Sequence, residues 1–284
     1  MRLIPVLAAA IVAATFAIPD SARAAGSYDS CTYFIDKLPA LLTSQGTWCL
    51  RKDLGSSLAG GEAVSVLANN VTIDCNGFKI GGLGAGPSTQ AAGIASLGRL
   101  NTVVRGCNVR GFHTGIRIDG GGGHVIEDNR VEGNQESGIV AESTTAVIRR
   151  NQVLDSGAAA TYIASGILVS GTVDVMDNTI DGVAPESDDY RHAAGIRSIT
   201  LDSSVISGNR VRGLAPTGDG VSFGVINQDV GAIHVHGNHL FGNGNPGDTG
   251  IYCTDARQLV TNNRMTGFDV GYSTCTGYDN LETK

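Results

Sequence analysis

The densest group of ionisable side chains in this sequence lies in segment 182–194, which reads GVAPESDDYRHAA. Between positions 186 and 192 only Ser187 is not ionisable, and the others are Glu186, Asp188, Asp189, Tyr190, Arg191 and His192. A neighbouring tyrosine and histidine can act as base and acid, and an arginine can neutralise a carboxylate next to the carbon that loses its proton. The acidic residues supply the hard oxygen ligands that calcium prefers. The segment therefore predicts catalytic roles for Tyr190, Arg191 and His192 and a calcium site on Glu186, Asp188 and Asp189. The alternative is a solvated loop.

An internal repeat predicts the framework that would position this segment. One position recurs along the chain and is asparagine in every repeat except one: Asn76, Cys107, Asn129, Asn151, Asn178, Asn209, Asn238 and Asn263. Isoleucine or valine stands three residues before each of them, and from Cys107 onward an apolar residue stands two residues after. The residues between are mostly polar. This alternation with a period of two predicts strands that bury one side.

A second recurring position, Gly-Ile in most repeats, follows each asparagine position. Each repeat is therefore expected to hold two or three short strands joined by turns. One repeat cannot bury its own apolar row, whereas repeats stacked about 4.8 Å apart cover one another. We therefore predict a parallel solenoid of about eight coils. Asparagine tolerates left-handed backbone, and its amides can bond from coil to coil, so we expect turns and an amide ladder at these positions.

The spacing between the two recurring positions predicts where loops leave the solenoid. From the glycine to the next asparagine position the distance is 12 to 14 residues, whereas from the asparagine position to its glycine it varies from 8 to 17. Insertions confined to one corner usually mark a binding face. The short coils that follow Cys107 and Asn129 would form the floor of a groove, with His113, Gln135 and Glu136 nearby.

With the isoleucines directed inward, the residues that follow them point outward beside these loops. This outward row is expected to contain Arg117, Val140, Leu168, Arg197, Ile226 and Tyr252. Apolar side chains can pack against the faces of sugar rings, and guanidinium groups can bind the carboxylates of sugars. The expected binding residues are therefore Arg117, Arg197, Tyr252, His113 and Glu136.

The segment NNVTIDCNG at 69–77, followed by repeats of the form VIxxNxVxG, resembles the right-handed parallel β-helix proteins of the pectate-lyase-like superfamily. The segment from Cys31 to Leu50 is similar to the capped N-terminal part of secreted bacterial members. The resemblance implies an all-β, single-stranded right-handed parallel β-helix with an N-terminal cap. It does not choose among lyases, glycosidases, epimerases, esterases, tailspikes and adhesins, because this fold carries many functions.

Near the N-terminus, Arg2 is followed by an apolar run and an Ala-x-Ala sequence, a pattern typical of a signal peptide. We expect a signal peptide at 1–24, a cap and first coil at 25–67, the β-helix at 68–275 and a tail at 276–284. Cleavage and export would allow disulfides, so Cys31–Cys49 and Cys253–Cys275 are expected to staple the two ends. Cys75 and Cys107 lie on neighbouring repeats and could pair or stay reduced. The expected location is secreted or periplasmic.

Three functions remain open from the sequence. The first is a lyase or C5-epimerase that acts on a uronic-acid polysaccharide, and the others are a non-catalytic glycan-binding or adhesion module and a glycoside hydrolase. The net charge of −7 argues against nucleic acid as a partner, and no later segment is apolar enough to insert into a membrane. We expect a monomer whose partner is a polysaccharide and whose only candidate cofactor is calcium.

Overall fold

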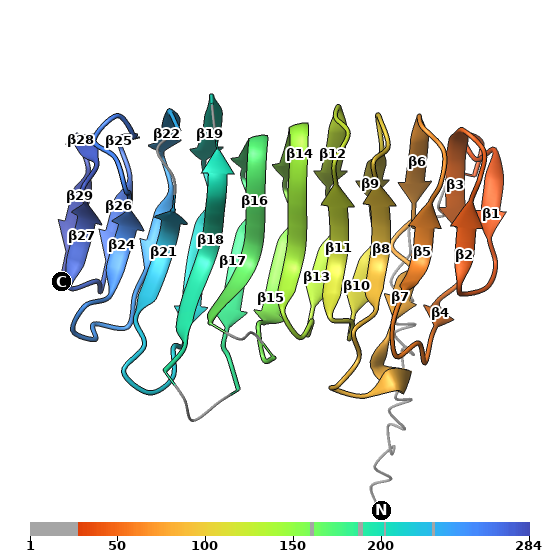
Figure 1. Ribbon diagram of the computed structural model, residues 1–284, viewed down its shortest axis with the longest axis horizontal. Helices are drawn as coiled ribbons and strands as arrows, with labels where there is room; N and C mark the ends of the chain where they lie inside the picture. The colour runs from red at the N-terminus through yellow and green to blue at the C-terminus, as the bar shows by residue number, and fades with distance from the viewer. Residues whose placement is uncertain (1–27, 160–161, 187–189, 202, 229–230) are drawn as a thin grey trace, which may run out of the picture.

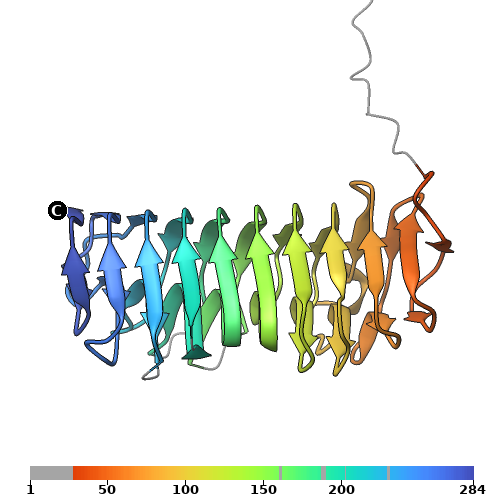
Figure 2. The same cartoon turned by 90° about the horizontal axis from the view of Figure 1, so that it is seen from above.

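The computed structural model describes residues 28–159, 162–186, 190–201, 203–228 and 231–284. The described chain winds as a solenoid whose coils lie side by side in chain order (Figures 1 and 2). The paired strands are parallel and form one 19-stranded and one 10-stranded sheet. This confirms the expected all-β parallel solenoid of about eight coils.

A typical coil contains three strands, the larger of the two numbers expected, and the strands form three rows along the solenoid. The first row contains β2 (Ala40–Leu42), β5 (Glu62–Val66), β8 (Ala92–Leu97), β11 (Thr114–Asp119), β14 (Ser137–Arg149), β16 (Ile163–Met176), β18 (His192–Leu201), β21 (Ser222–Asn227), β24 (Thr249–Tyr252) and β27 (Val270–Ser273). The second row is continuous with the first through β14 and β16 and otherwise contains β1 (Tyr33–Ile35), β3 (Gly46–Leu50), β6 (Val71–Asp74), β9 (Val103–Arg105), β12 (His124–Glu127), β19 (Ser204–Ser207), β22 (Ile233–His236), β25 (Leu259–Thr261) and β28 (Thr276–Tyr278).

The third row is the 10-stranded sheet. It contains β4 (Leu54–Gly55), β7 (Lys79–Gly81), β10 (Asn108–Arg110), β13 (Arg130–Glu132), β15 (Gln152–Ser156), β17 (Thr179–Val183), β20 (Arg210–Leu214), β23 (His239–Phe241), β26 (Arg264–Thr266) and β29 (Leu281–Thr283). The strands β28 and β29 pair with β25 and β26, so the stack continues past 275, where the sequence placed a tail. A short 3-10 helix, η1 (Leu83–Ala85), lies between β7 and β8.

The core is made of inward rows in register, as the alternation predicted. Ile116, Ile139, Ile167 and Ile196 are direct partners on successive coils, and each is fully buried. Complete burial of such a side chain contributes about 1.5–3 kcal/mol relative to exposure. The residue before each of these isoleucines is glycine because a larger side chain would not fit there. A Cβ added at Gly138 would collide with the side chain of Val153 on β15.

The amide ladder is confirmed and is longer than the sequence suggested. The Nδ2 atom of Asn129 donates to Oδ1 of Asn151 at 3.0 Å and to the carbonyl of Val104, one coil earlier, at 2.9 Å. The ladder continues to one residue that the repeat had not included, and it runs through Asn151, Asn178, Asn209, Asn238, Asn263 and Asn280. Most of these asparagines are almost fully buried, so the ladder satisfies polar groups that water cannot reach.

Two details of the asparagine interpretation were wrong. The left-handed residue is the one before the ladder position, as at Asp128 (φ 56°), Arg150 (φ 54°) and Asp177 (φ 56°), and not the ladder asparagine itself. Asn76 is left-handed (φ 49°) but lies outside the ladder, and its Nδ2 donates to the carbonyl of Leu50 at 3.4 Å. The turn between β6 and β7 is two residues longer than the turn between β9 and β10, which shifts the repeat at this point.

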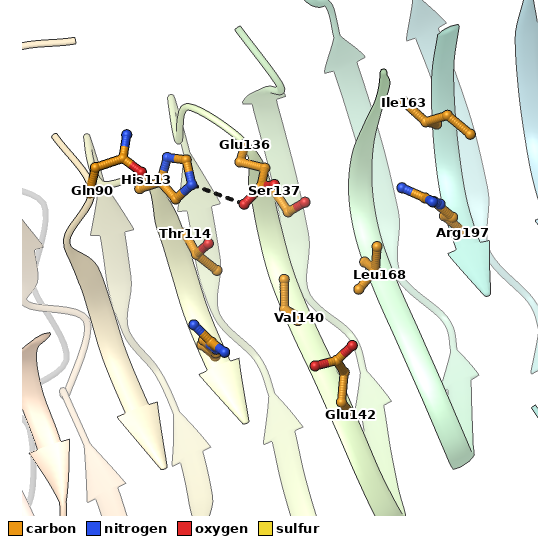
Figure 3. Close-up of a pocket in the computed structure, with 11 residues that line it drawn as sticks. Gln90, His113, Thr114, Glu136, Ser137, Val140, Glu142, Ile163, Leu168 and Arg197 are labelled. Carbon is orange, nitrogen blue, oxygen red and sulfur yellow. Dashed lines mark ion pairs between the residues drawn. The ribbon is translucent and has the colours of Figure 1, made fainter. Parts of the chain in front are cut away.

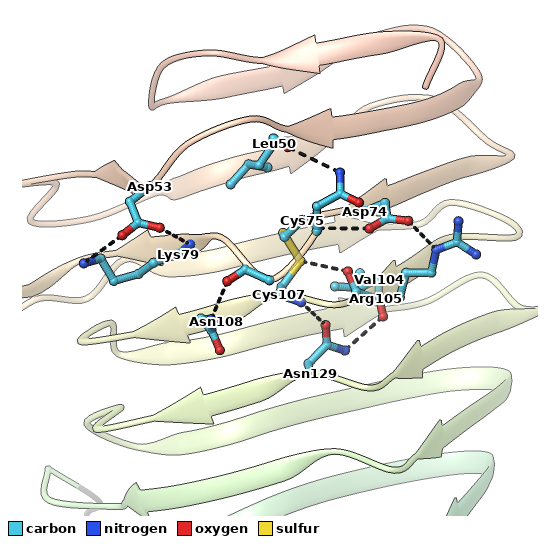
Figure 4. The surroundings of a disulfide bond; sticks show 12 residues. Leu50, Asp53, Asp74, Cys75, Lys79, Val104, Arg105, Cys107, Asn108 and Asn129 are labelled. Carbon is cyan, nitrogen blue, oxygen red and sulfur yellow. Dashed lines mark hydrogen bonds and ion pairs between the residues drawn. A yellow bond between two sulfur atoms is a disulfide. The ribbon is translucent and has the colours of Figure 1, made fainter. Parts of the chain in front are cut away.

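Three disulfides link neighbouring coils. Cys31–Cys49 and Cys253–Cys275 form as expected, and Cys75–Cys107 forms as well. The backbone N–H of Cys107 donates to Oδ1 of Asn129 at 3.0 Å, so this disulfide continues the amide ladder toward the N-terminus (Figure 4). Closing a loop of 32 residues removes chain entropy worth roughly 3–4 kcal/mol from the unfolded state.

The longest connections leave the solenoid at one edge. They join the third-row strands to the first-row strands, and in Figure 1 their described residues lie along the lower edge between β7 and β8, β17 and β18, and β20 and β21. The connections between β10 and β11 and between β13 and β14 are short. This is the arrangement that the spacing predicted. Within the described part of the chain, no helix has the length and apolar character needed to cross a bilayer.

The ladder should carry a measurable share of the stability. We expect Asn178→Ala to lower the free energy of unfolding by about 3 kcal/mol, because it leaves the Ile148 carbonyl and the Asn151 N–H without their partners in the core. Asn108→Ala removes an amide that makes one exposed hydrogen bond, to the carbonyl of Gly77, and should cost less than about 1 kcal/mol. Urea unfolding followed by circular dichroism measures both, and equal losses for the two variants would contradict a special role for the ladder.

Candidate functional site

A groove of about 360 Å³ crosses the outer face of β11, β14, β16 and β18 (Figure 3). Gln90 lies near one end of it, and Ile163 and Arg197 lie near the other. The lining residues are Gln90, His113, Thr114, Arg117, Glu136, Ser137, Val140, Glu142, Ile163, Leu168 and Arg197. The groove therefore brings together four of the residues that the sequence assigned to binding, namely His113, Arg117, Glu136 and Arg197. Gln135, expected near the floor, is not among the lining residues.

His113 and Glu136 form a pair across two successive coils. They come from the short connections before β11 and β14, and the backbone N–H of Glu136 donates to the carbonyl of His113 at 2.8 Å. The side chains meet as well, with Nε2 of His113 3.0 Å from a carboxylate oxygen of Glu136. Coil stacking alone therefore places these two groups side by side.

The electrostatic setting keeps Glu136 ionised. The hydrogen bond from His113 is the main cause that holds the pKa of Glu136 below its ordinary value of 4.5, and the charges of Arg117 and Arg197 act in the same direction. With Nε2–H donated to Glu136, the imidazole is held in one orientation. Its Nδ1 is buried and has no hydrogen-bond partner among the described residues. The His113–Glu136 pair therefore holds the Nε2 proton between the imidazole nitrogen and a carboxylate oxygen at the edge of the groove.

Arg197 is the cation in the groove whose charge is least compensated by nearby acidic groups. Its Nε donates to the neutral amide oxygen of Gln228 at 2.8 Å, and it forms no ion pair with any described residue. Burial lowers the pKa of Arg197, and the charge of Glu136 opposes that effect. Arg117, by contrast, pairs with Asp119 at 3.0 Å. The Arg197 guanidinium points along the groove toward the side of Glu136 (Figure 3).

The outward row is in the register that the sequence predicted. Arg117 pairs with Val140, Val140 with Leu168, and Leu168 with Arg197. The row then continues through Ile226 to Tyr252. Tyr252 lies two coils beyond Arg197, outside the residues that line the groove, and its ring contacts Phe223 with centroids 5.8 Å apart.

The segment expected to be catalytic lies beside the groove rather than in it. His192 is buried at the start of β18, and its Nδ1 accepts a hydrogen bond from the N–H of Val221 at 3.1 Å. Burial lowers the pKa of His192. Its ring lies edge-on to Tyr162 and Tyr190, with centroids 5.2 and 4.7 Å away. Tyr190 is 46% exposed.

Arg191 and the proposed calcium ligands are only partly placed. The backbone of Arg191 exchanges hydrogen bonds with Thr217, which ties the loop to the next coil. Glu186 is exposed, and its N–H donates to the carbonyl of Ala158. Asp188 and Asp189 lie outside the described residues. Among the described residues, no cluster of three or more histidine, cysteine or acidic side chains could hold a metal ion.

One ionisable side chain of the groove, Glu142, was not predicted from the sequence. It lies two residues after Val140 on β14 and pairs with Asp119 of β11 in the sheet. The same alternation that placed Val140 outward also places Glu142 outward, so the signal was present. Thr114 and Ser137 also line the groove, but they have the parity of the inward Ile116 and Ile139, so the alternation does not account for them.

Comparison with known proteins identifies the family. A family model described as "Right handed beta helix region" matches residues 55–196, which is half of the chain. The chain belongs to this right-handed β-helix family. The match confirms the resemblance inferred from the repeats. No curated protein matches the sequence of this β-helix protein.

Several solved structures are similar to this chain at low sequence identity and low TM-score. An alginate lyase from Paenibacillus sp. str. FPU-7 has a TM-score of 0.42 at 15% identity, over 84% of this β-helix chain and 91% of the lyase chain. A tailspike protein mutant of E. coli bacteriophage HK620, in complex with a hexasaccharide, has a TM-score of 0.46 at 14% identity, over 85% and 52% of the two chains. The catalytic domain of a GH87 α-1,3-glucanase in complex with nigerose has a TM-score of 0.41 at 11% identity, over 90% and 64%.

The His113–Glu136 pair predicts a pH-dependent contribution to stability. Because the pKa of Glu136 in the folded protein lies below its unfolded value, its ionised form adds stability above about pH 4.5, and this contribution is lost as the pH falls through the lower folded-state value. We expect Glu136→Gln to lower the free energy of unfolding by up to about 1 kcal/mol at pH 7, since the side chain is half exposed and screened. The difference from the wild type should shrink at pH 3.

Urea unfolding at pH 7 and pH 3 measures this difference. Glu142→Gln is the matched control, because Glu142 lines the same groove and makes no ion pair with the described residues. A deficit of Glu136→Gln that stays constant between the two pH values would show that the His113 contact does not stabilise the carboxylate.

Proposed function

We propose that the groove binds an acidic polysaccharide and removes a proton next to a uronate carboxylate, as a lyase or C5-epimerase does. The observation that carries this proposal is Arg197, a half-buried guanidinium whose hydrogen-bond partner is the neutral Gln228. Removing a cation from water is costly unless a counter-charge replaces the lost solvent. A carboxylate of the substrate supplies that charge and can bind a guanidinium through two hydrogen bonds.

The reaction needs a cation, a base and a group that returns or supplies a proton. Arg197 neutralises the carboxylate. The base takes the proton from the adjacent carbon. In elimination the bond to the leaving oxygen then breaks and that oxygen receives a proton, whereas in epimerisation a proton returns to the same carbon from the opposite face. The His113–Glu136 pair is our first candidate for proton transfer, since both residues line the groove and the Nε2–H of His113 is hydrogen-bonded to the Glu136 carboxylate.

Tyr190 remains the second candidate for proton transfer, and the role of His192 changes. The Tyr190 hydroxyl belongs to an exposed side chain at the edge of β18, whereas the Nδ1 of His192 is engaged by the Val221 N–H. We assign His192 to holding the ring of Tyr190, with Arg191 fixing the loop through Thr217. A calcium ion held by Glu186 with Asp188 and Asp189 remains part of the proposal as a second source of positive charge.

A non-catalytic glycan-binding module is the second candidate function. It is favoured by a line of rings beside the groove, in which the exposed Tyr162 and Tyr190 contact His192, and His192 contacts the buried Phe223 next to Tyr252. Aromatic rings present large apolar faces that suit sugar rings and need no chemistry. Sugar recognition by this line of rings would not require the His113–Glu136 pair.

Glycoside hydrolysis fits the described residues less well. The two carboxylates that line the groove are six positions apart in the chain, with Glu136 directly before β14 and Glu142 on it. At a strand rise of about 3.3 Å per residue their Cα atoms lie roughly 20 Å apart. Hydrolases of the two-carboxylate type need separations of about 5–9.5 Å between the carboxyl groups.

The three disulfides support the proposal that the protein is exported to an oxidising compartment. The expected signal peptide at 1–24 lies outside the described residues. A secreted or periplasmic monomer that meets a polysaccharide outside the cytoplasm is consistent with the proposed activity.

The proposal is tested with alginate, polygalacturonate and hyaluronan. Elimination creates an unsaturated product that absorbs in the ultraviolet, and epimerisation in heavy water incorporates deuterium. We expect activity on one of these polymers, with kcat/KM lowered about 10- to 100-fold in Arg197→Gln, because a charge-assisted contact of about 1.5–3 kcal/mol is lost. Arg257→Gln, which changes an exposed ion pair with Asp255 near the far end, is the control and should retain wild-type activity.

Further variants separate the assigned roles. A large loss of kcat in His113→Ala, with a smaller loss in the double variant Tyr190→Phe, His192→Ala, would support proton transfer by the His113–Glu136 pair. A larger loss of kcat in the double variant than in His113→Ala would instead assign catalysis to the segment 190–192. Loss of activity in EDTA would support calcium. Binding without any product would favour the second candidate function, and absence of both binding and turnover would exclude the proposal.

A further inference from the structure

We propose a second polysaccharide-binding site, a basic stripe on the outer face of the 10-stranded sheet formed by Arg210, His239 and Arg264. These residues lie on β20, β23 and β26 and are direct partners in register. All three are exposed. The stripe belongs to the third row of strands, whereas the groove lies on the first row, so the two sites are on different sheets.

The other cations on this face show what makes the stripe unusual. Lys79 lies 3.6 Å from Asp53. Arg110 and Arg130 both pair with Glu132, at 3.4 and 2.5 Å. Arg212 lies 2.7 Å from Asp181. In the N-terminal and central coils, the basic side chains of this face therefore have a carboxylate partner on the same or a neighbouring coil.

The stripe lacks this compensation. Among the described residues, neither Arg210 nor Arg264 forms an ion pair, and His239 has no acidic partner. The guanidinium of Arg210 instead lies over the ring of Phe241, 5.5 Å from its centroid. That contact holds the cation at the surface without neutralising it.

Stacked like charges do not help the fold. Arg210 and Arg264 each lie one strand, about 4.8 Å, from His239 and therefore about 10 Å from each other, so the charges of the two arginines repel each other weakly. A ligand with negative charges repeated along its length would relieve this repulsion if it lay along the solenoid axis. A single small anion would contact only part of the stripe.

The chemistry of the ligand follows from the charge of the protein and from guanidinium recognition. Guanidinium groups bind carboxylates through paired hydrogen bonds. The net charge of −7 repels a polymer as densely charged as nucleic acid, whereas a carboxylated polysaccharide carries fewer charges per length. We therefore assign the stripe to a uronate-containing chain. This choice among polyanions rests on the proposed function, and the stripe would keep the polymer attached while the groove acts on it.

The test compares binding of polygalacturonate with turnover in the groove. We expect the double variant Arg210→Gln, Arg264→Gln to bind polygalacturonate about tenfold more weakly at low salt and with a smaller salt dependence. Isothermal titration at two salt concentrations measures both quantities. The matched control is Arg110→Gln, Arg130→Gln, which removes the same charge from the same face where it was already paired, and should change affinity less than about twofold.

Three further measurements complete the test. The unfolding midpoint of the stripe variant should equal or exceed that of the wild type, because repulsion is relieved, and this result separates lost binding from misfolding. Turnover of a short oligosaccharide should be unchanged by the stripe variant but reduced by Arg197→Gln. If Arg197→Gln has no effect while the stripe variant loses polymer binding, the proposed function fails and the stripe stands.

Two results would overturn the stripe. One is equal affinity of the wild type and the stripe variant for polygalacturonate, or an equal loss in the control variant. The other is tighter binding of single-stranded DNA than of polygalacturonate by the wild type, which would assign the stripe to a different class of polymer.

Discussion

Hydrogen bonding between successive coils is the constraint on which the rest of this structure depends. A single coil has no partner for its strand backbone and cannot cover its own apolar row, so it is stable only against its neighbours. The parallel pairing keeps Ile116, Ile139 and Ile167 in one inward row. A slip of one residue would turn that row outward and would bury the residues that line the groove. The same register that stabilises the core thus determines which side chains reach the surface.

The site follows from this register with few additional requirements. Equivalent positions on adjacent coils are held next to each other, as the hydrogen bond from the Glu136 N–H to the His113 carbonyl shows. Two short connections therefore suffice to bring an imidazole and a carboxylate together. The longer connections before β8 and β18 leave from the same edge and flank these short ones. Because the coils fix the backbone, variation in loops and outward residues can change the chemistry of the groove without altering the fold.

The sequence predicted what depends on the repeat and failed where the chain departs from it. Alternation placed Arg117, Arg197 and Tyr252 in one outward row, and the pairing confirms it. Asn76 was assigned to the ladder because the repeat was extended through a turn that contains two additional residues. The burial of His192 could not be predicted, since it arises from rings on three different coils that pack together only in the folded protein. Distances between side chains of different loops depend on such packing and have no periodic signal.

In a parallel solenoid, a cation without an ion pair departs from the usual arrangement of surface charges. In this fold a charged residue on the surface has a predictable neighbour one coil away, so a carboxylate at that position is enough to compensate it. Arg150 with Asp128 and Arg212 with Asp181 follow this rule. Arg197 and the residues of the basic stripe do not, although the same solution was geometrically available to them. A single exposed ion pair adds little stability, so its absence costs the fold little. Without an ion pair, positive charges remain at a fixed spacing on the surface of an acidic protein. Recognition of an acidic polymer requires such an array of charges.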